Sequence, residues 1–221
     1  MMIAMPEPAP SYLAFGDSYT VGEGVEPSEA WPHFLIRLLE DRGHRLEGPT
    51  IVARTGWTTD ELLEAASGAV CPPDPALVTL MVGVNDQYRG RPIGELRAAF
   101  RHLLEMVAER APSSRLLVLS IPDWGATPFA AGRDRDEIAA AVDTFNAEER
   151  SLVHSAGARW LDVTPLSRKA AADPALVAGD GLHFSALAHR LVAEAALSPA
   201  LQILGKLAGR PEGFSPGRGS A

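Results

Sequence analysis

Short apolar runs alternate with amphipathic segments along most of this chain, and that alternation restricts the possible fold more than any other feature. The runs at 77–82 and 116–121 are nearly continuous, as in strands that are covered on both faces. The segments between the runs carry apolar residues at helical spacing, for example Leu96, Phe100 and Leu103. The expected strands span residues 12–15, 51–53, 77–82, 116–121 and 159–163, and the expected helices begin near residues 27, 58, 92, 134 and 185. The pattern predicts an α/β fold, a single-domain α/β/α sandwich around a five-stranded parallel sheet.

The flavodoxin-like strand order 2-1-3-4-5 is the simplest doubly wound arrangement of five such strands, and it places the first strand between the second and the third. Functional sites in these sheets form beyond the carboxyl ends of strands where the order reverses. The first strand leads into Ser18, the second into Gly56 and the third into Asn85. We therefore expect a hydroxyl, a glycine N–H and a carboxamide to meet there. Together they can form a nucleophile, Ser18, with an oxyanion hole from Ser18, Gly56 and Asn85.

A serine nucleophile needs a base, and the segment Gly179-Asp180-Gly181-Leu182-His183-Phe184-Ser185 offers one on a glycine-rich loop before a helix. Asp180 stands three residues before His183, so a turn can bring its carboxylate to the imidazole Nδ1. The other histidines, His33, His44, His102, His154 and His189, lie in or near expected helices and are interpreted as surface or half-buried. The predicted catalytic residues are therefore Ser18, Asp180 and His183.

Four separated blocks of this sequence resemble the SGNH hydrolase family, also called GDSL esterases/lipases. The blocks are Gly16-Asp17-Ser18, Gly56, Gly83-Val84-Asn85-Asp86 and Asp180-Gly181-Leu182-His183, and the likeness covers about residues 12–200. The resemblance implies a flavodoxin-like hydrolase with Ser18 as nucleophile, His183 as base, Asp180 as the residue that orients it, and no metal or organic cofactor. Tyr19 stands where the motif that names the family has leucine. Asp17 and Asp86 are expected to brace loops rather than to react.

Three other classes of protein agree less well with this sequence. The α/β-hydrolase nucleophile elbow would require glycine at Thr20. A metal-dependent phosphoesterase would draw on Asp17, Asp86, Asp180 and His183, but further converging ligands are missing from the pattern. A non-catalytic flavodoxin-like module that binds a flavin or nucleotide would need a phosphate loop, and neither GxGxxG nor GxxxxGK[ST] occurs. A serine esterase agrees best with the residues.

The expected reaction is hydrolysis of short-chain carboxylic esters through an acyl-enzyme. The same site could serve a lysophospholipase, an acyl-CoA thioesterase or a carbohydrate deacetylase, and these alternatives stay open. The tentative substrate pocket comprises Trp57, Tyr88, Arg89 and Trp124. A short-chain preference is expected because the loops near the site hold few aliphatic residues.

Composition limits the kinds of partner that the protein can be expected to bind. The chain has 221 residues and a net charge of −8, which argues against nucleic acid or an anionic membrane as the main partner. The single cysteine, Cys71, excludes an internal disulfide. Residues 1–10 lack the basic and apolar parts of a signal peptide, so a cytoplasmic location is expected. We expect a hydrolase domain over 10–207 and a disordered tail over 208–221, with a small-molecule ester as substrate and no stable membrane insertion.

Overall fold

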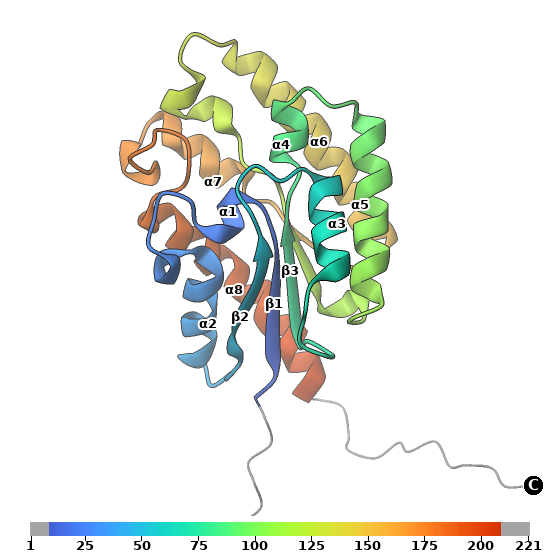
Figure 1. Cartoon of the computed structure of the whole chain (residues 1–221). Coiled ribbons are helices and arrows are strands. Elements are labelled where there is room, and N and C mark those ends of the chain that lie inside the picture. The colour runs from blue at the N-terminus through green and yellow to red at the C-terminus, as the bar shows by residue number, and fades with distance from the viewer. Residues whose placement is uncertain (1–8, 209–221) are drawn as a thin grey trace, which may run out of the picture.

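The structure, a computed structural model, describes residues 9–208, and the expected tail lies almost wholly outside them. Five parallel strands form one sheet in the order β2-β1-β3-β4-β5, which confirms the predicted flavodoxin-like α/β fold (Figure 1). The strands are β1 (Ser11–Gly16), β2 (Glu47–Ala53), β3 (Leu77–Met81), β4 (Leu116–Leu119) and β5 (Arg159–Leu161). The helices are α1 (Ser18–Val21), α2 (Trp31–Glu40), α3 (Thr59–Gly68), α4 (Val84–Tyr88), α5 (Ile93–Ala108), α6 (Arg135–Ser155), α7 (Thr164–Arg168) and α8 (Ala186–Ala208).

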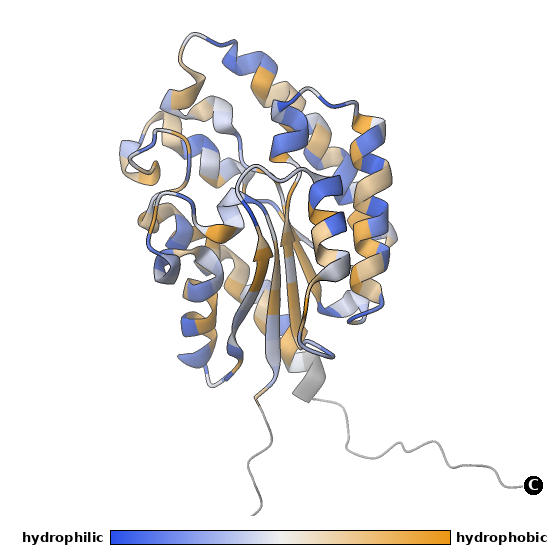
Figure 2. Ribbon diagram, viewed as in Figure 1, coloured by the Kyte–Doolittle hydropathy of each residue, from blue (hydrophilic) through white to orange (hydrophobic). Residues whose placement is uncertain are grey.

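Alternate side chains of the central strand face two separate layers of the core. Tyr12 and Ala14 of β1 pack with α2 and α8, whereas Leu13 and Phe15 pack with α3 and α5. Figure 2 shows the apolar colour concentrated on the strands and on the helix faces turned toward them. Because both faces are covered, the inner strands have no polar side, which explains their continuous apolar sequences.

Strand β2 begins at Glu47, four residues earlier than the expected start at residue 51. Its early part, Glu47-Gly48-Pro49, has poor strand propensity, and proline cannot donate to a ladder. The segment is tolerated because β2 pairs with β1 on one side only and forms an edge of the sheet. Leu187 also differs from expectation, since its side chain is 45% exposed instead of facing the core.

His189, in α8, is completely buried, in contrast to the surface or half-buried position expected from the sequence. Its Nδ1 accepts a hydrogen bond from the Trp31 N–H at 3.3 Å, which satisfies one donor at the start of α2. Burial, together with the charge of His183, lowers the pKa of His189 to about 4. His189 is therefore a neutral acceptor that joins α8 to α2.

We expect the contribution of His189 to the free energy of unfolding to decrease as the pH drops from about 6.5 toward 4. In that window His189 takes up a proton in the unfolded chain but not in the folded protein. The free energy of unfolding that it contributes therefore falls by an amount on the order of 3 kcal/mol. Urea unfolding at several pH values measures it. In His189→Asn the amide oxygen can still accept a hydrogen bond from the Trp31 N–H, but the side chain does not titrate. The free energy of unfolding of the variant should therefore increase relative to that of the wild type as the pH falls. Exposed His102→Asn is the control, and parallel curves for His189→Asn and the wild type would contradict the prediction.

Among residues 9–208, no helix combines the length and the apolar character that crossing a bilayer requires.

Candidate active site

The carboxyl ends of β1, β2 and β3 lie at one level, because Gly16 pairs with Ala53 on one side and with Met81 on the other. The loops after these three strands therefore emerge at the same edge of the sheet, the upper edge in Figure 1. This register brings together segments that are far apart in the sequence. It places Ser18, Gly56 and Asn85 around the switch point that the strand order defines.

Ser18 is the first residue of the one-turn helix α1, whereas the sequence suggested a glycine-rich turn at this place. Asp17 caps the helix, since its Oδ1 accepts from the Tyr19 N–H at 3.0 Å. Burial raises the pKa of Asp17 to about 7, against that hydrogen bond, and the charge of Asp86 raises it further. The cap fixes the backbone on which Ser18 stands, and the Ser18 side chain is buried except on the side of a neighbouring cavity.

Ser18, His183 and Asp180 form a continuous chain of hydrogen bonds. Ser18 Oγ lies 3.0 Å from His183 Nε2, and His183 Nδ1 lies 2.6 Å from Asp180 Oδ2. The other carboxylate oxygen of Asp180 accepts from the Leu182 and His183 N–H groups at 2.9 and 3.0 Å. Partial burial works to raise the pKa of Asp180, but these hydrogen bonds, first that from the His183 ring, outweigh it and hold the pKa below its usual value. Asp180 is thus an ionised carboxylate aimed at the imidazole.

The loop that carries His183 is held in place by backbone pairing and by contacts between aromatic rings. The His183 carbonyl accepts from the Ala178 N–H at 2.8 Å, and Val177 pairs with Phe184 in an antiparallel bridge. The Tyr19 ring packs against His183 and Phe184, with centroid distances of 5.2 and 4.8 Å. Tyr19, the departure from the family motif, therefore supports the imidazole by direct contact.

Gly56 and Asn85, the residues expected to supply oxyanion donors, follow the two strands on either side of β1. Gly56 has φ +86°, a left-handed conformation that favours glycine, and its carbonyl accepts from Arg89 Nη2 at 2.6 Å. Asn85 Nδ2 donates to the Trp57 carbonyl at 2.9 Å, which leaves its second N–H available. The Ser18 and Gly56 N–H groups have no hydrogen-bond partner among residues 9–208. Three donors can therefore point at one oxyanion beside Ser18.

Asp86 braces the same region, as the sequence suggested. Its Oδ2 accepts from the Thr59 N–H at 2.8 Å and from the Thr59 hydroxyl at 3.0 Å. Burial raises the pKa of Asp86, although these two hydrogen bonds and the charge of Arg91 oppose the shift. The side chain joins the start of α3 to α4 and thereby holds the Gly56 and Asn85 segments together.

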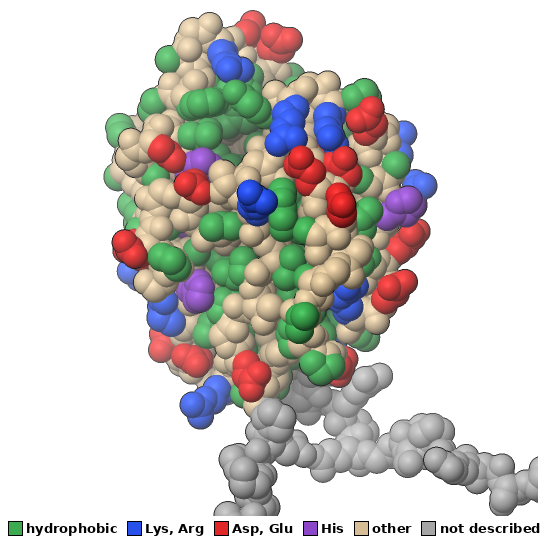
Figure 3. Space-filling view, in the orientation of Figure 1, with side chains coloured by type: hydrophobic (Ala, Val, Ile, Leu, Met, Phe, Trp, Pro, Cys, Tyr) green, Lys and Arg blue, Asp and Glu red, His purple; other side chains and the backbone are tan. Residues whose placement is uncertain are grey.

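A cavity of about 110 Å³ opens directly beside the Ser18 hydroxyl. Its lining residues are Ser18, Tyr19, Val84, Asn85, Tyr88, Trp124, Phe129, Leu182 and His183. The Tyr88, Trp124 and Phe129 rings contact one another with centroid distances of 5.3 to 6.1 Å and form a continuous aromatic wall. Figure 3 shows hydrophobic side chains gathered in the upper part of this face, next to a histidine.

Two of the four residues expected in the substrate pocket, Tyr88 and Trp124, line this cavity, and the other two do not. Trp57, partly buried, packs instead against the core layer that contains Leu13, Phe15 and Leu62. Arg89 is turned toward Gly56 and Glu61, so it holds the Gly56 loop in place. Phe129 also lines the cavity, and only the folded loop shows that its ring joins that of Trp124.

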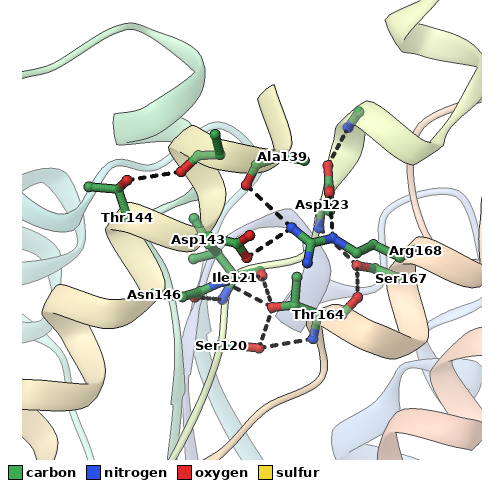
Figure 4. Close-up of polar contacts among 12 residues, drawn as sticks. Ser120, Ile121, Asp123, Ala139, Asp143, Thr144, Asn146, Thr164, Ser167 and Arg168 are labelled. Carbon is green, nitrogen blue, oxygen red and sulfur yellow. Dashed lines mark hydrogen bonds and ion pairs between the residues drawn. The ribbon is translucent and has the colours of Figure 1, made fainter. Parts of the chain in front are cut away.

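The loop that bears Trp124 is tied to α6 and α7 by a polar network (Figure 4). Arg168 donates to Asp123 Oδ2 and to Asp143 Oδ1, both at 2.8 Å, and the Asp123 N–H donates to Ser167 Oγ at 2.8 Å. This network fixes the aromatic wall from behind. No motif in the sequence indicated it, because its members come from three separate elements.

A hydroxyl, an imidazole and a carboxylate joined in sequence by hydrogen bonds are the arrangement typical of a serine hydrolase. Among residues 9–208, no group of three or more His, Cys, Asp or Glu side chains is arranged to hold a metal ion. The profile of the GDSL-like Lipase/Acylhydrolase family matches residues 14–191. The chain belongs to this family, in agreement with the resemblance seen in its four sequence blocks.

Individual relatives are distant. Esterase TesA of Pseudomonas aeruginosa is 26% identical over 130 residues, a match that spans 57% of this chain and 62% of that esterase. A lipolytic G-D-S-L family protein of Veillonella parvula superposes with a TM-score of 0.69 at 18% identity, covering 86% of this chain and 97% of its own. The acetylxylan esterase Axe2 of Geobacillus stearothermophilus gives a TM-score of 0.67 at 18% identity, covering 89% and 96%. The structural matches show a shared fold.

Proposed function

We propose that the protein is a serine esterase that hydrolyses short-chain carboxylic esters through an acyl-enzyme. One observation carries the proposal: Ser18 Oγ, the His183 imidazole and the Asp180 carboxylate form one hydrogen-bonded series of 3.0 and 2.6 Å. Family membership supports ester hydrolysis as the reaction class. A cytoplasmic location and a domain that ends near residue 207 stay predictions from the sequence.

The reaction follows from the geometry of the three side chains. His183 Nε2 takes the Ser18 proton as Oγ attacks the ester carbonyl, and Asp180 stabilises the imidazolium that results. The Ser18 N–H, the Gly56 N–H and Asn85 Nδ2 hold the oxyanion of the tetrahedral intermediate. Collapse breaks the ester bond, and the alcohol leaves with the proton from His183. Water then attacks the acyl carbonyl as one of its protons passes to His183; collapse breaks the bond between the acyl group and Ser18 Oγ, releases the acid and returns the proton from His183 to Oγ.

A phosphonate ester probe tests the proposal directly. We expect one covalent adduct on Ser18 by mass spectrometry, with parallel loss of p-nitrophenyl acetate hydrolysis, and we expect the hydrolysis to survive EDTA. A protein that stays active after full labelling would contradict it, and loss of activity in EDTA would favour metal-dependent chemistry instead.

The cavity supports a short acyl group. A closed apolar cavity of roughly 150 Å³ holds one benzene molecule. The cavity beside Ser18, at about 110 Å³, is smaller, and the aromatic wall closes one side of it. We propose that the acyl chain lies between Val84, Leu182 and this wall, so that a chain of a few carbons fills the space.

The wild type should prefer p-nitrophenyl esters with the shortest acyl groups in a series from C2 to C12. Phe129→Ala should move the preference toward longer chains, because Phe129 is 41% exposed and its removal opens the cavity outward. The kcat/KM for longer esters relative to the shortest should rise by about tenfold in the variant, which corresponds to the burial of one or two additional methylene groups. Phe34→Ala, a partly buried phenylalanine on α2, is the matched control and should keep the wild-type profile. A wild-type optimum at C8 or longer would overturn the short-chain assignment; acetylated sugars, an acyl-CoA and a lysophospholipid run in parallel test the other substrate classes.

A further inference from the structure

Glu149, on the inner face of α6, is a buried carboxyl group with no role in the proposed acyl transfer. Its side chain is 0% exposed, and neither carboxyl oxygen has a hydrogen-bond partner among the residues that the structure describes. A buried carboxylate without a partner is strongly destabilising, and even a neutral carboxyl group in this position is costly. Such a group therefore calls for a specific explanation.

The helix that carries Glu149 is held firmly one turn earlier, at Asn146. The Asn146 amide accepts from the Ile121 N–H at 2.8 Å and donates to the Ile121 carbonyl and Thr164 Oγ1 at 3.2 and 2.9 Å (Figure 4). All its side-chain polar atoms are bonded within the protein. The lack of partners at Glu149 thus does not come from a loosely placed helix, because the same face of α6 is fixed to the end of β4.

The Glu149 carboxyl group packs directly against the turn that leads from β3 to Asn85. A Cβ atom added to Gly83 would lie only 2.3 Å from Glu149 Oε1. Gly83 also has φ +125°, outside the conformations that other residues adopt, and it caps α4, whose second residue is Asn85. The sequence block around Asn85 therefore has glycine at this position for two reasons: its backbone conformation and the contact with Glu149.

The charged groups that face Glu149 are acidic. The carboxylate of Asp86 comes from α4, and that of Asp17 precedes α1, where its Oδ2 also lacks a partner among residues 9–208. Burial raises the pKa of Glu149 well above its ordinary value, and the charges of Asp86 and Asp17 raise it further. Arg91, which lies 3.8 Å from Asp86, binds Asp60 at 2.5 Å, and Arg97 pairs with Glu148. Nothing around Glu149 in the described part of the chain therefore favours its ionised form.

We propose that Glu149 is a positioning residue that works as a neutral carboxylic acid, supporting the Gly83 turn and thereby the placement of Asn85 in the oxyanion hole. The neutral form fills the space behind Gly83 without adding a third negative charge, beside those of Asp17 and Asp86, near the developing oxyanion. Its O–H group is also a hydrogen-bond donor in a region where Asp17 Oδ2 lacks a partner among residues 9–208. Ionisation at high pH would place that charge close to the site and impair the step in which the oxyanion forms. The proposal rests on the proposed esterase function.

The pH dependence of kcat tests the positioning role. Glu149→Gln keeps the shape and a donor but cannot ionise, so its kcat near neutral pH should stay within about threefold of the wild type. As the pH is raised into the alkaline range, the wild-type kcat should fall about tenfold while that of Glu149→Gln falls less than about twofold. Glu149→Leu, which fills the space without a donor, should lose about tenfold in kcat with little change in KM. Glu148→Gln, at the adjacent partly buried position that pairs with Arg97, should follow the wild type. An alkaline loss that is equal in Glu149→Gln and the wild type, or full kcat in Glu149→Leu, would overturn the proposal.

Unfolding by urea tests the neutral form without any substrate. The raised pKa means that the folded state keeps a proton which the unfolded state loses above the ordinary value of 4.5, so the contribution of Glu149 to wild-type stability should decline as the pH rises. The midpoint of Glu149→Gln relative to the wild type should therefore increase from about pH 5 to pH 9. A constant difference would contradict a neutral Glu149. If the wild type hydrolyses no ester, the proposed function fails while this measurement still decides the protonation state.

Discussion

Alanine in place of Ser18 should lower kcat/KM for p-nitrophenyl acetate by about 10⁴- to 10⁶-fold, the range typical of removing the nucleophile of a serine hydrolase. The hydroxyl lies 3.0 Å from its base and beside the cavity, and no other hydroxyl is hydrogen-bonded to the His183 ring among residues 9–208. The loss should appear in kcat, because the cavity walls that bind the substrate are left intact. Steady-state kinetics with active-site titration measures both quantities.

His183→Ala should cost a similar factor, and the double variant with Ser18→Ala should be hardly slower than either single variant. This non-additivity follows because the proton transfer needs both groups, so that removing one of them already disables the other. Ser67→Ala, which removes an exposed hydroxyl bonded only to the Leu63 carbonyl, is the matched control and should keep full activity. Wild-type turnover in Ser18→Ala would refute the nucleophile.

The residues around Ser18 could be predicted because their positions depend on local sequence and on strand order alone. Each of Ser18, Gly56 and Asn85 follows an apolar run, and parallel strands in the order 2-1-3-4-5 end at one edge. Asp180 and His183 are three residues apart, so a single turn is enough to join them. None of these inferences required knowledge of how distant side chains pack.

Other features depend on contacts that no local pattern encodes. Trp57 and Arg89 lie close to the site residues in the sequence. In the fold, however, the Trp57 ring packs against the core, and the Arg89 guanidinium donates a hydrogen bond to the Gly56 carbonyl. Phe129 reaches the cavity only because Arg168 and Ser167 hold the preceding loop. Glu149 is an intermediate case: it continues the spacing of Ile138, Val142 and Phe145, which are all buried, so the helical period did place it inward. A charged residue at a helical position that faces the core is itself an indication of a special role.

Asn85→Ala should lower kcat by about 10²- to 10³-fold and leave KM nearly unchanged, since the amide assists only when the carbonyl oxygen becomes an oxyanion. Part of the effect would come from the Trp57 carbonyl, which accepts from Asn85 Nδ2 at 2.9 Å and loses its donor in the variant. Two further measurements separate this indirect contribution from oxyanion binding.

Asn85→Asp has nearly the same shape but offers no N–H to the oxyanion, and its negative charge repels one. Its kcat should fall at least as far as that of the alanine variant, although the side chain still fills the same space beside Trp57. The affinity for a phosphonate that mimics the tetrahedral intermediate should fall in proportion to kcat/KM in both variants, while binding of the uncharged alcohol product stays near that of the wild type. If Asn85 served only to hold the Trp57 segment, product and phosphonate affinities would decline together. A selective loss of phosphonate affinity therefore assigns Asn85 to the transition state, and with it the role of the Gly83 turn and of the buried Glu149 behind it.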